Sequence, residues 1–179
     1  MPFRWKVLGL GNLLKRDDGF GPRFIEYLKR EDLSSRVDLL DLGTGAADLL
    51  SLLSFNGGII ILDALQGGGG EPGDLYLLES RELLSKYRSR VCGGSTDEKA
   101  GDAAVASLSY APSIRFNLHA ADILEIITQA SYCYGDRMAS PLYLLSVEVS
   151  NIDWGTEMTS MVKESLPRAR ELVLKILQT

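Results

Sequence analysis

The stretch VLGLGNLLKRDDGFG, residues 7–21, decides the fold of this chain. It opens with an apolar run typical of a strand that is covered on both faces. The run breaks at residues 9–12 (GLGN), where two glycines permit a tight turn and a close approach of the backbone. Two adjacent carboxylates, Asp17 and Asp18, follow, and the pattern from Pro22 onward is that of an amphipathic helix. This order predicts a ligand site at the carboxyl end of a first strand.

Two further apolar runs also end in an acid. The run from Val37 stops at Asp41, and the run of residues 59–62 (IIIL) is followed directly by Asp63, where we expect the strand to end. The runs alternate with helical patterns, which predicts parallel strands joined by right-handed crossovers. The loops that carry the acids should therefore lie along one edge of a sheet.

The rest of the chain completes a single domain, 1–179, of the α/β class. Strands are predicted at residues 74–78 and 142–149, and a long terminal helix at 159–178. His119, the one histidine of the chain, precedes an amphipathic helix predicted at 120–129. The stretch from about residue 88 to 112 is polar and irregular, and we interpret it as an insertion.

Composition excludes several classes of protein. A net charge of -5 lacks the basic footprint of a nucleic-acid binder, and no apolar run reaches the roughly 20 residues that span a bilayer. Cys92 and Cys133 are too far apart for a CxxC motif, and the first residues do not read as a signal peptide. We expect a cytoplasmic protein with free thiols and with neither nucleic acid nor membrane as a partner. The oligomeric state stays open.

The candidate chemistry rests on Asp18, Asp63 and His119. Carboxylate oxygens and an imidazole nitrogen suit a borderline divalent ion such as Zn²⁺ or Ni²⁺. Without a metal, the same groups could act as a general base and its orienting partners. Simpler roles are also open: the acids could stabilise a helix start or cap a loop, and the histidine could cap a helix.

A different function is suggested by the glycine turn together with Lys15 and Arg16. Two glycines after a strand resemble part of a dinucleotide-binding fingerprint, and the two cations could attract phosphate. The third glycine of that fingerprint would fall on Leu14. A nucleotide-binding, doubly wound domain therefore stays an alternative.

The segment GLGNLLKRDDGFGPRFIEYL, residues 9–28, resembles the signature GxGNxLxxDDGxG of the hydrogenase maturation protease family. Further segments are similar to that family, in the same order along the chain. They are DLGTGAADLL (41–50), IILDAL (60–65), the segment around His119 and SVEVSNIDWGTEMT (146–159). The resemblance covers nearly the whole chain except the stretch at about 88–112.

The resemblance implies a three-layer α/β sandwich, with a mostly parallel, twisted five-stranded sheet and helices on both faces. It implies an endopeptidase, often grouped with the aspartic type, that removes the C-terminal extension of a nickel-containing hydrogenase large-subunit precursor after nickel insertion. Asp18, Asp63 and His119 match the family's metal-binding and catalytic positions. The nickel would be carried by the substrate, and other divalent ions could occupy the site in vitro. A non-catalytic chaperone that senses the nickel state is a further alternative.

Overall fold

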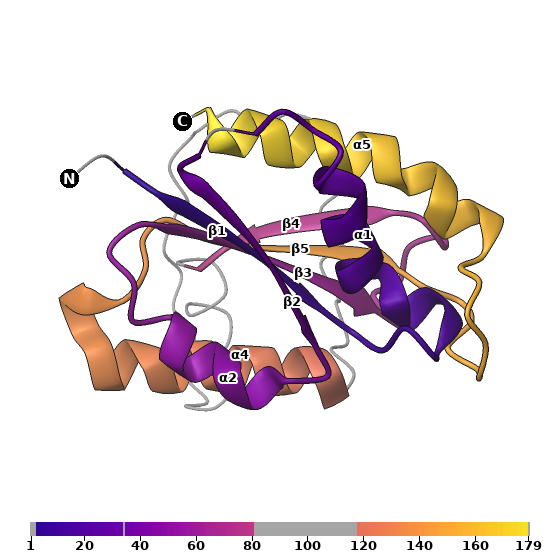
Figure 1. Cartoon of the computed structure of the whole chain (residues 1–179). Helices are drawn as coiled ribbons and strands as arrows, with labels where there is room; N and C mark the ends of the chain where they lie inside the picture. Colours follow the sequence, from indigo (N-terminus) through magenta and orange to yellow (C-terminus); the bar gives the residue numbers. More distant parts are fainter. Residues whose placement is uncertain (1–2, 34, 81–117, 179) are drawn as a thin grey trace, which may run out of the picture.

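The computed structural model describes residues 3–33, 35–80 and 118–178, without the side chains of 46–47 and 118–122. Its elements alternate between strands and helices for most of the chain (Figure 1). They are β1 (Trp5–Leu10), η1 (Arg16–Gly19), α1 (Phe20–Leu28), β2 (Val37–Gly43), α2 (Ala46–Leu52), β3 (Gly58–Leu65), β4 (Leu75–Glu79), α4 (Leu118–Tyr134), η2 (Gly135–Arg137), β5 (Leu142–Glu148) and α5 (Ser160–Leu177).

The described strands form one five-stranded sheet in the order β2-β1-β3-β5-β4. Neighbouring strands are parallel except β4, which runs antiparallel to β5. The four parallel strands therefore end at the same edge, on the right in Figure 1. We call this the carboxyl edge.

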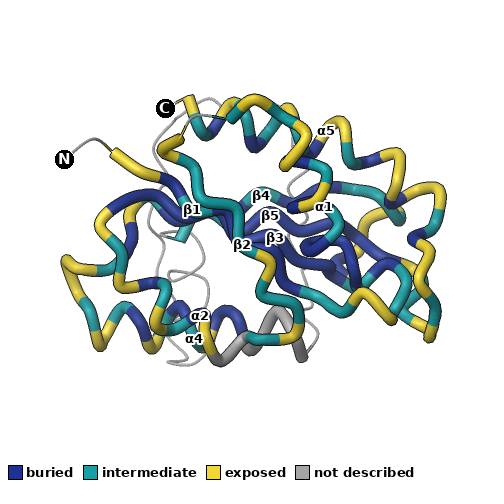
Figure 2. Tube along the Cα trace, in the orientation of Figure 1, coloured by how far each residue is buried: buried dark blue, intermediate teal, exposed yellow. Residues whose placement is uncertain are grey.

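The described helices cover both faces of the sheet. α1 and α5 lie on one face and α2 and α4 on the other (Figure 1). Successive strand residues point to opposite faces, so Val7 packs in the core beneath α1 and α5 while Leu8 packs in the core beneath α2 and α4. The central strands β1, β3 and β5 are accordingly buried between more exposed helices, whereas the edge strand β2 is only partly buried (Figure 2).

β3 is the most buried strand because apolar residues, three of them β-branched isoleucines, dominate GIIILDAL. All of its residues are buried. It continues past Asp63 to Leu65, so the prediction that the strand ends at Asp63 was wrong: Ala64 and Leu65 extend the apolar run and pair with β5. Asp63 is a strand residue opposite Ser146.

The predicted α/β sandwich, with its mostly parallel five-stranded sheet, is confirmed. Two helix starts differ from prediction. α1 begins at Phe20 rather than Pro22, and α4 begins at Leu118, which places His119 within its first turn. The predicted insertion at 88–112 lies outside the described residues. Within the described part of the chain, no helix is both long and apolar enough to cross a membrane.

Candidate active site

The loop after β1 lies directly against the sheet because glycines remove side chains from its contacts. A Cβ atom on Gly9 would lie 2.6 Å from the carbonyl oxygen of Gly21. A Cβ on Gly21 would lie 2.2 Å from the oxygen of Leu10 and 2.7 Å from that of Leu62. Real Cβ atoms do not come so close to backbone. The start of α1 is thereby seated on the ends of β1 and β3.

The same loop folds back on itself around Asp18. The backbone N–H of Asn12 donates to the Asp18 carboxylate, at 3.1 Å between nitrogen and oxygen, and lies 3.2 Å from the Asp18 carbonyl oxygen. A Cβ on Gly11, whose φ is +135°, would overlap that carbonyl. The two glycines of the turn thus allow the chain to bring Asp18 back to the end of β1.

Asp63, a residue of β3, lies at the same carboxyl edge as Asp18. Its side chain is 5% exposed. Burial raises the pKa of the Asp63 carboxyl to about 8, and this outweighs the opposing effect of a hydrogen bond from the Ala64 N–H. The negative charge of nearby Asp18 raises the pKa further. Two acids that are 45 positions apart in sequence therefore interact at the carboxyl edge.

This pair is suited to proton transfer or to a cation. Near neutral pH the Asp63 carboxyl holds a proton beside a second carboxyl, which is the arrangement that lets one acid donate and the other accept. A divalent ion would offset the repulsion between two carboxylates and release the proton of Asp63. Both chemistries that the sequence left open remain compatible with the geometry.

His119 approaches the edge through its helix. Because β5 starts at the opposite edge, α4 has to run back across the sheet and so begins at the carboxyl edge, as Figure 1 shows. His119 is the second residue of α4, and its side chain is among those outside the description. Among the described residues, no group of three histidine, cysteine, aspartate or glutamate side chains could hold a metal. The assignment of His119 as a ligand therefore stays a prediction.

The other acids of the motif loops face elsewhere. Asp17 is fully buried, and its carboxylate accepts hydrogen bonds from Thr159, the residue that precedes α5. Asp41 lies in β2 opposite Gly9, is exposed, and accepts a hydrogen bond from the Gly43 N–H. Since β1 separates β2 from β3, Asp41 stands two strands away from Asp63, or about 10 Å.

Sequence reasoning missed a buried carboxylate at the end of β5. Glu148 accepts hydrogen bonds from the backbone N–H groups of Gly67 and Gly68 and from the hydroxyl of Tyr76, at 2.8–3.1 Å. It fixes the glycine loop that follows β3, on the same edge as Asp63. A signal was present, because Glu148 is a charged residue within the apolar strand LYLLSVE.

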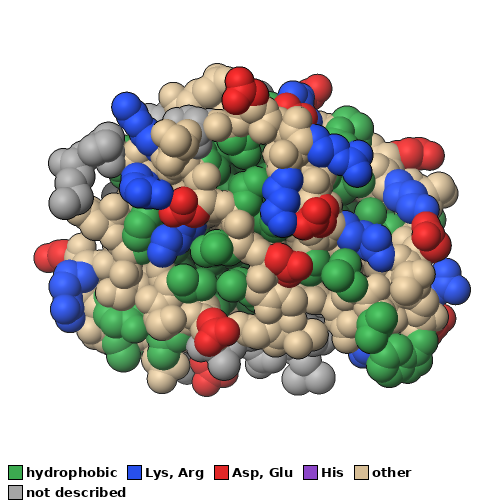
Figure 3. All heavy atoms as spheres, viewed as in Figure 1, with side chains coloured by type: hydrophobic (Ala, Val, Ile, Leu, Met, Phe, Trp, Pro, Cys, Tyr) green, Lys and Arg blue, Asp and Glu red, His purple; other side chains and the backbone are tan. Residues whose placement is uncertain are grey.

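Two loops beside the acids expose large apolar side chains. The Gly155 N–H donates to the Leu14 carbonyl and the Arg16 N–H to the Gly155 carbonyl, at 2.9 and 2.8 Å. Leu14 and Trp154 are 56% and 73% exposed on these loops, and the Lys15 ammonium lies over the Trp154 ring. In Figure 3, hydrophobic side chains gather at the lower right, the end of the molecule where these loops lie.

The contacts of the glycine turn argue against nucleotide binding. The N–H of Gly11 donates to the Gly43 carbonyl, and the N–H of Asn12 donates to Asp18. In dinucleotide-binding turns, such N–H groups face a phosphate. Here a carboxylate takes that place, and its charge would repel a phosphate.

The comparisons with known proteins agree with one another. A family model described as hydrogenase maturation protease matches residues 22–91. The HupD hydrogenase expression/formation protein of Rhizobium leguminosarum bv. viciae is 26% identical over 97% of this chain and 73% of its own length. The hydrogenase 2 maturation protease of Escherichia coli is 33% identical over 48% of this chain and 52% of its own length.

Solved structures share the whole fold. The hydrogenase maturating endopeptidase HybD of Escherichia coli superposes with a TM-score of 0.73 and 22% identity, over 98% of this chain and 93% of that one. A hydrogenase 2 maturation peptidase from a Thaumarchaeota archaeon gives a TM-score of 0.62 and 26% identity, over 97% of both chains.

The architecture defines an α/β protein with the fold of the maturation endopeptidases. The family model matches part of the chain and the relatives match it at modest identity, so the chain is similar in sequence to hydrogenase maturation proteases and shares their fold.

Proposed function

We propose that this protein is the endopeptidase that removes the C-terminal extension of a nickel-containing hydrogenase large-subunit precursor, after nickel insertion. Similarity to hydrogenase maturation proteases and to a maturating endopeptidase supports a peptidase that acts on a hydrogenase precursor. The observation that carries the proposal is the meeting of Asp18 and Asp63 at the carboxyl edge, where burial and mutual repulsion keep a proton on Asp63.

In this proposal the nickel belongs to the substrate. Asp18, Asp63 and His119 would meet the ion while the precursor's own ligands still hold it. Carboxylate and imidazole groups suit such an ion, and the start of α4 at the carboxyl edge brings the backbone of His119 to the required side of the sheet. Binding of the ion would thus restrict cleavage to precursors that already contain nickel.

The protein's own part in cleavage is the handling of protons. When a cation approaches, the Asp63 carboxyl would release its proton to the surrounding water, because a positive charge lowers the pKa that burial had raised. Asp18, which is less buried, would accept a proton from the attacking water and pass it to the amine nitrogen that leaves when the peptide bond breaks. A nickel-polarised carbonyl would make that attack easier.

The test is a cleavage assay on purified precursor, with and without nickel, that follows the released C-terminal peptide by mass spectrometry. We expect cleavage only of the loaded precursor, and its loss in Asp18→Asn and His119→Ala. Asp38→Asn is the matched control, because Asp38 is an exposed acid on β2 paired with Arg4. Tight binding of the loaded precursor without cleavage would instead indicate the chaperone. Equal cleavage by the wild type and His119→Ala would remove His119 from the site.

A further inference from the structure

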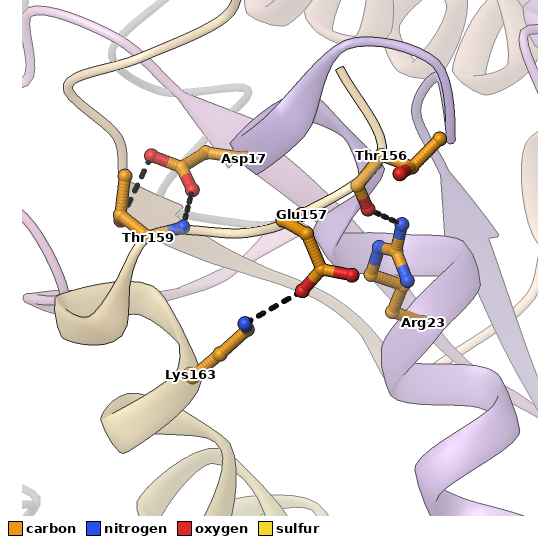
Figure 4. A network of polar contacts seen from close by, with 6 residues as sticks. All are labelled: Asp17, Arg23, Thr156, Glu157, Thr159 and Lys163. Carbon is orange, nitrogen blue, oxygen red and sulfur yellow. Dashed lines mark hydrogen bonds and ion pairs between the residues drawn. The ribbon is translucent and has the colours of Figure 1, made fainter.

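The acidic pair of the loop after β1 divides into two side chains with opposite surroundings. Asp18 is partly exposed and lies close enough to Asp63 for its charge to raise the pKa of the Asp63 carboxyl, whereas Asp17 is fully buried. One Asp17 oxygen accepts a 2.6 Å hydrogen bond from the Thr159 N–H, and the other accepts the Thr159 hydroxyl at 3.1 Å. Figure 4 shows both oxygens turned toward Thr159.

These bonds explain why a carboxylate is tolerated in the interior. Thr159 is the residue that precedes α5, and its own side chain makes no capping bond. Asp17 supplies the missing acceptor from a different segment, 142 positions away, and places its charge at the positive end of the helix dipole. Hydrogen bonds to a charged acceptor are strong enough to offset part of the cost of burial.

Backbone bonds join the same two segments. The Asp17 N–H donates to the Asn151 carbonyl at 3.2 Å, and the Arg16 N–H donates to the Gly155 carbonyl at 2.8 Å. Arg16 has a φ of +40°, a conformation that costs a non-glycine residue free energy and persists only where its surroundings hold it. The segment that carries Asp18 is therefore strained and is held by residues 151–159.

Two further contacts hold residues 151–159 in place. The Arg23 guanidinium of α1 donates to the Thr156 carbonyl, and Glu157 pairs with Lys163 of α5 at 2.8 Å (Figure 4). Residues 151–159 are thus linked to both α1 and α5, and Asp17 is the buried acceptor between them.

We propose that Asp17 is the positioning residue of this site: by fastening η1 to residues 151–159, it fixes where the Asp18 carboxylate stands relative to Asp63. The inference rests on the proposed function for its catalytic meaning. Adjacent Cα atoms are about 3.8 Å apart, so a displacement of Asp17 moves Asp18 by a similar amount. A misplacement of about 1 Å at a reacting group can cost on the order of 10²-fold in rate.

The test compares Asp17→Ala and Asp17→Asn with Val173→Ala. Val173 is fully buried in α5, near the helix end opposite η1, so Val173→Ala lowers the melting temperature without touching η1. For Asp17→Ala we expect kcat on the loaded precursor to fall about 10²-fold while KM changes little, and Ni²⁺ alone to bind at least about 10-fold more weakly. Asp17→Asn keeps one acceptor for the Thr159 N–H and should lie between Asp17→Ala and the wild type. Val173→Ala should keep kcat within about twofold at temperatures where it is folded.

Equal losses of kcat in Asp17→Ala and Val173→Ala would overturn the proposal, because the effect would then be one of stability alone. A crystal structure of Asp17→Ala in which Asp18 still accepts the Asn12 N–H beside Asp63 would overturn it at any level of activity. If the wild type fails to cleave the loaded precursor, the proposed function fails, and that crystal structure still decides the role of Asp17.

Discussion

The ends of β3 and β5 each bury one carboxylate, to the same extent and with different surroundings. Asp63 and Glu148 are both 5% exposed. Glu148 faces two backbone N–H groups and a tyrosine hydroxyl, whereas Asp63 has a pKa raised to about 8 by burial and has Asp18 as a neighbour. Burial alone therefore does not tell a structural acid from a functional one. What distinguishes the two acids is the set of hydrogen-bond donors around each carboxylate.

The largest expected difference between the two acids is in cleavage. Asp63→Asn should lower kcat/KM on loaded precursor by about 10³-fold or more, because it removes a group that exchanges a proton with its surroundings. Glu148→Gln should cost less than about 10-fold, since an amide can still accept from Gly67 and Gly68. Cleavage is measured as the initial rate of peptide release. Similar losses in both variants would contradict the expected difference between Asp63 and Glu148.

The second difference is the pH dependence of stability. The folded-state pKa of Asp63 is raised above the unfolded value of about 3.9, so the folded state binds the proton more tightly and stability falls as pH rises from about 4 to about 8. At about 1.4 kcal/mol per pH unit, Asp63→Asn should gain up to about 4 kcal/mol over the wild type between pH 5 and pH 8. Urea unfolding at both pH values measures this gain.

Asp38→Asn serves as the control for that experiment, because Asp38 is exposed. The free energy of unfolding of Asp38→Asn, relative to the wild type, should not rise comparably between pH 5 and pH 8. A flat difference between Asp63→Asn and the wild type across the same range would mean that Asp63 is ionised at neutral pH.

The third expected effect is on the glycine loop. Glu148→Ala leaves the N–H groups of Gly67 and Gly68 without their acceptor in a buried place, which should destabilise the protein by about 3 kcal/mol. The free energy of unfolding from urea titration measures it. A loss below about 1 kcal/mol would show that water replaces the carboxylate at little cost.

The smallest effect expected is that of Tyr76→Phe. It removes one of the hydrogen bonds to Glu148 and keeps the ring, so a loss of about 1 kcal/mol is expected. The same change made together with Glu148→Ala should cost little more, because the partner is already absent. A double-mutant cycle on the free energy of unfolding tests this coupling.

Much of the fold could be predicted because its signals are local. Apolar runs and glycine turns predict the strands, and their alternation with helices predicts a parallel sheet whose acids share an edge. The meeting of Asp18 and Asp63 follows from that topology, since β1 and β3 are neighbours. The end of β3 was misplaced because an acid within a strand reads as the end of the strand.

The roles of Asp17 and Glu148 could not be predicted, because their partners are distant in sequence. Asp17 bonds Thr159, and Glu148 bonds loop residues 80 and 81 positions away. Adjacent acids such as Asp17 and Asp18 look alike in a sequence, and only the packing of residues 151–159 separates them.

The glycines of β1 and α1 limit how the first helix can move relative to the sheet. Main chain meets main chain at Gly9 and Gly21, so no rotamer change at this junction can let the helix slide or tilt away from the strands. The first turn of the helix is therefore a fixed reference for the loop that carries Asp18.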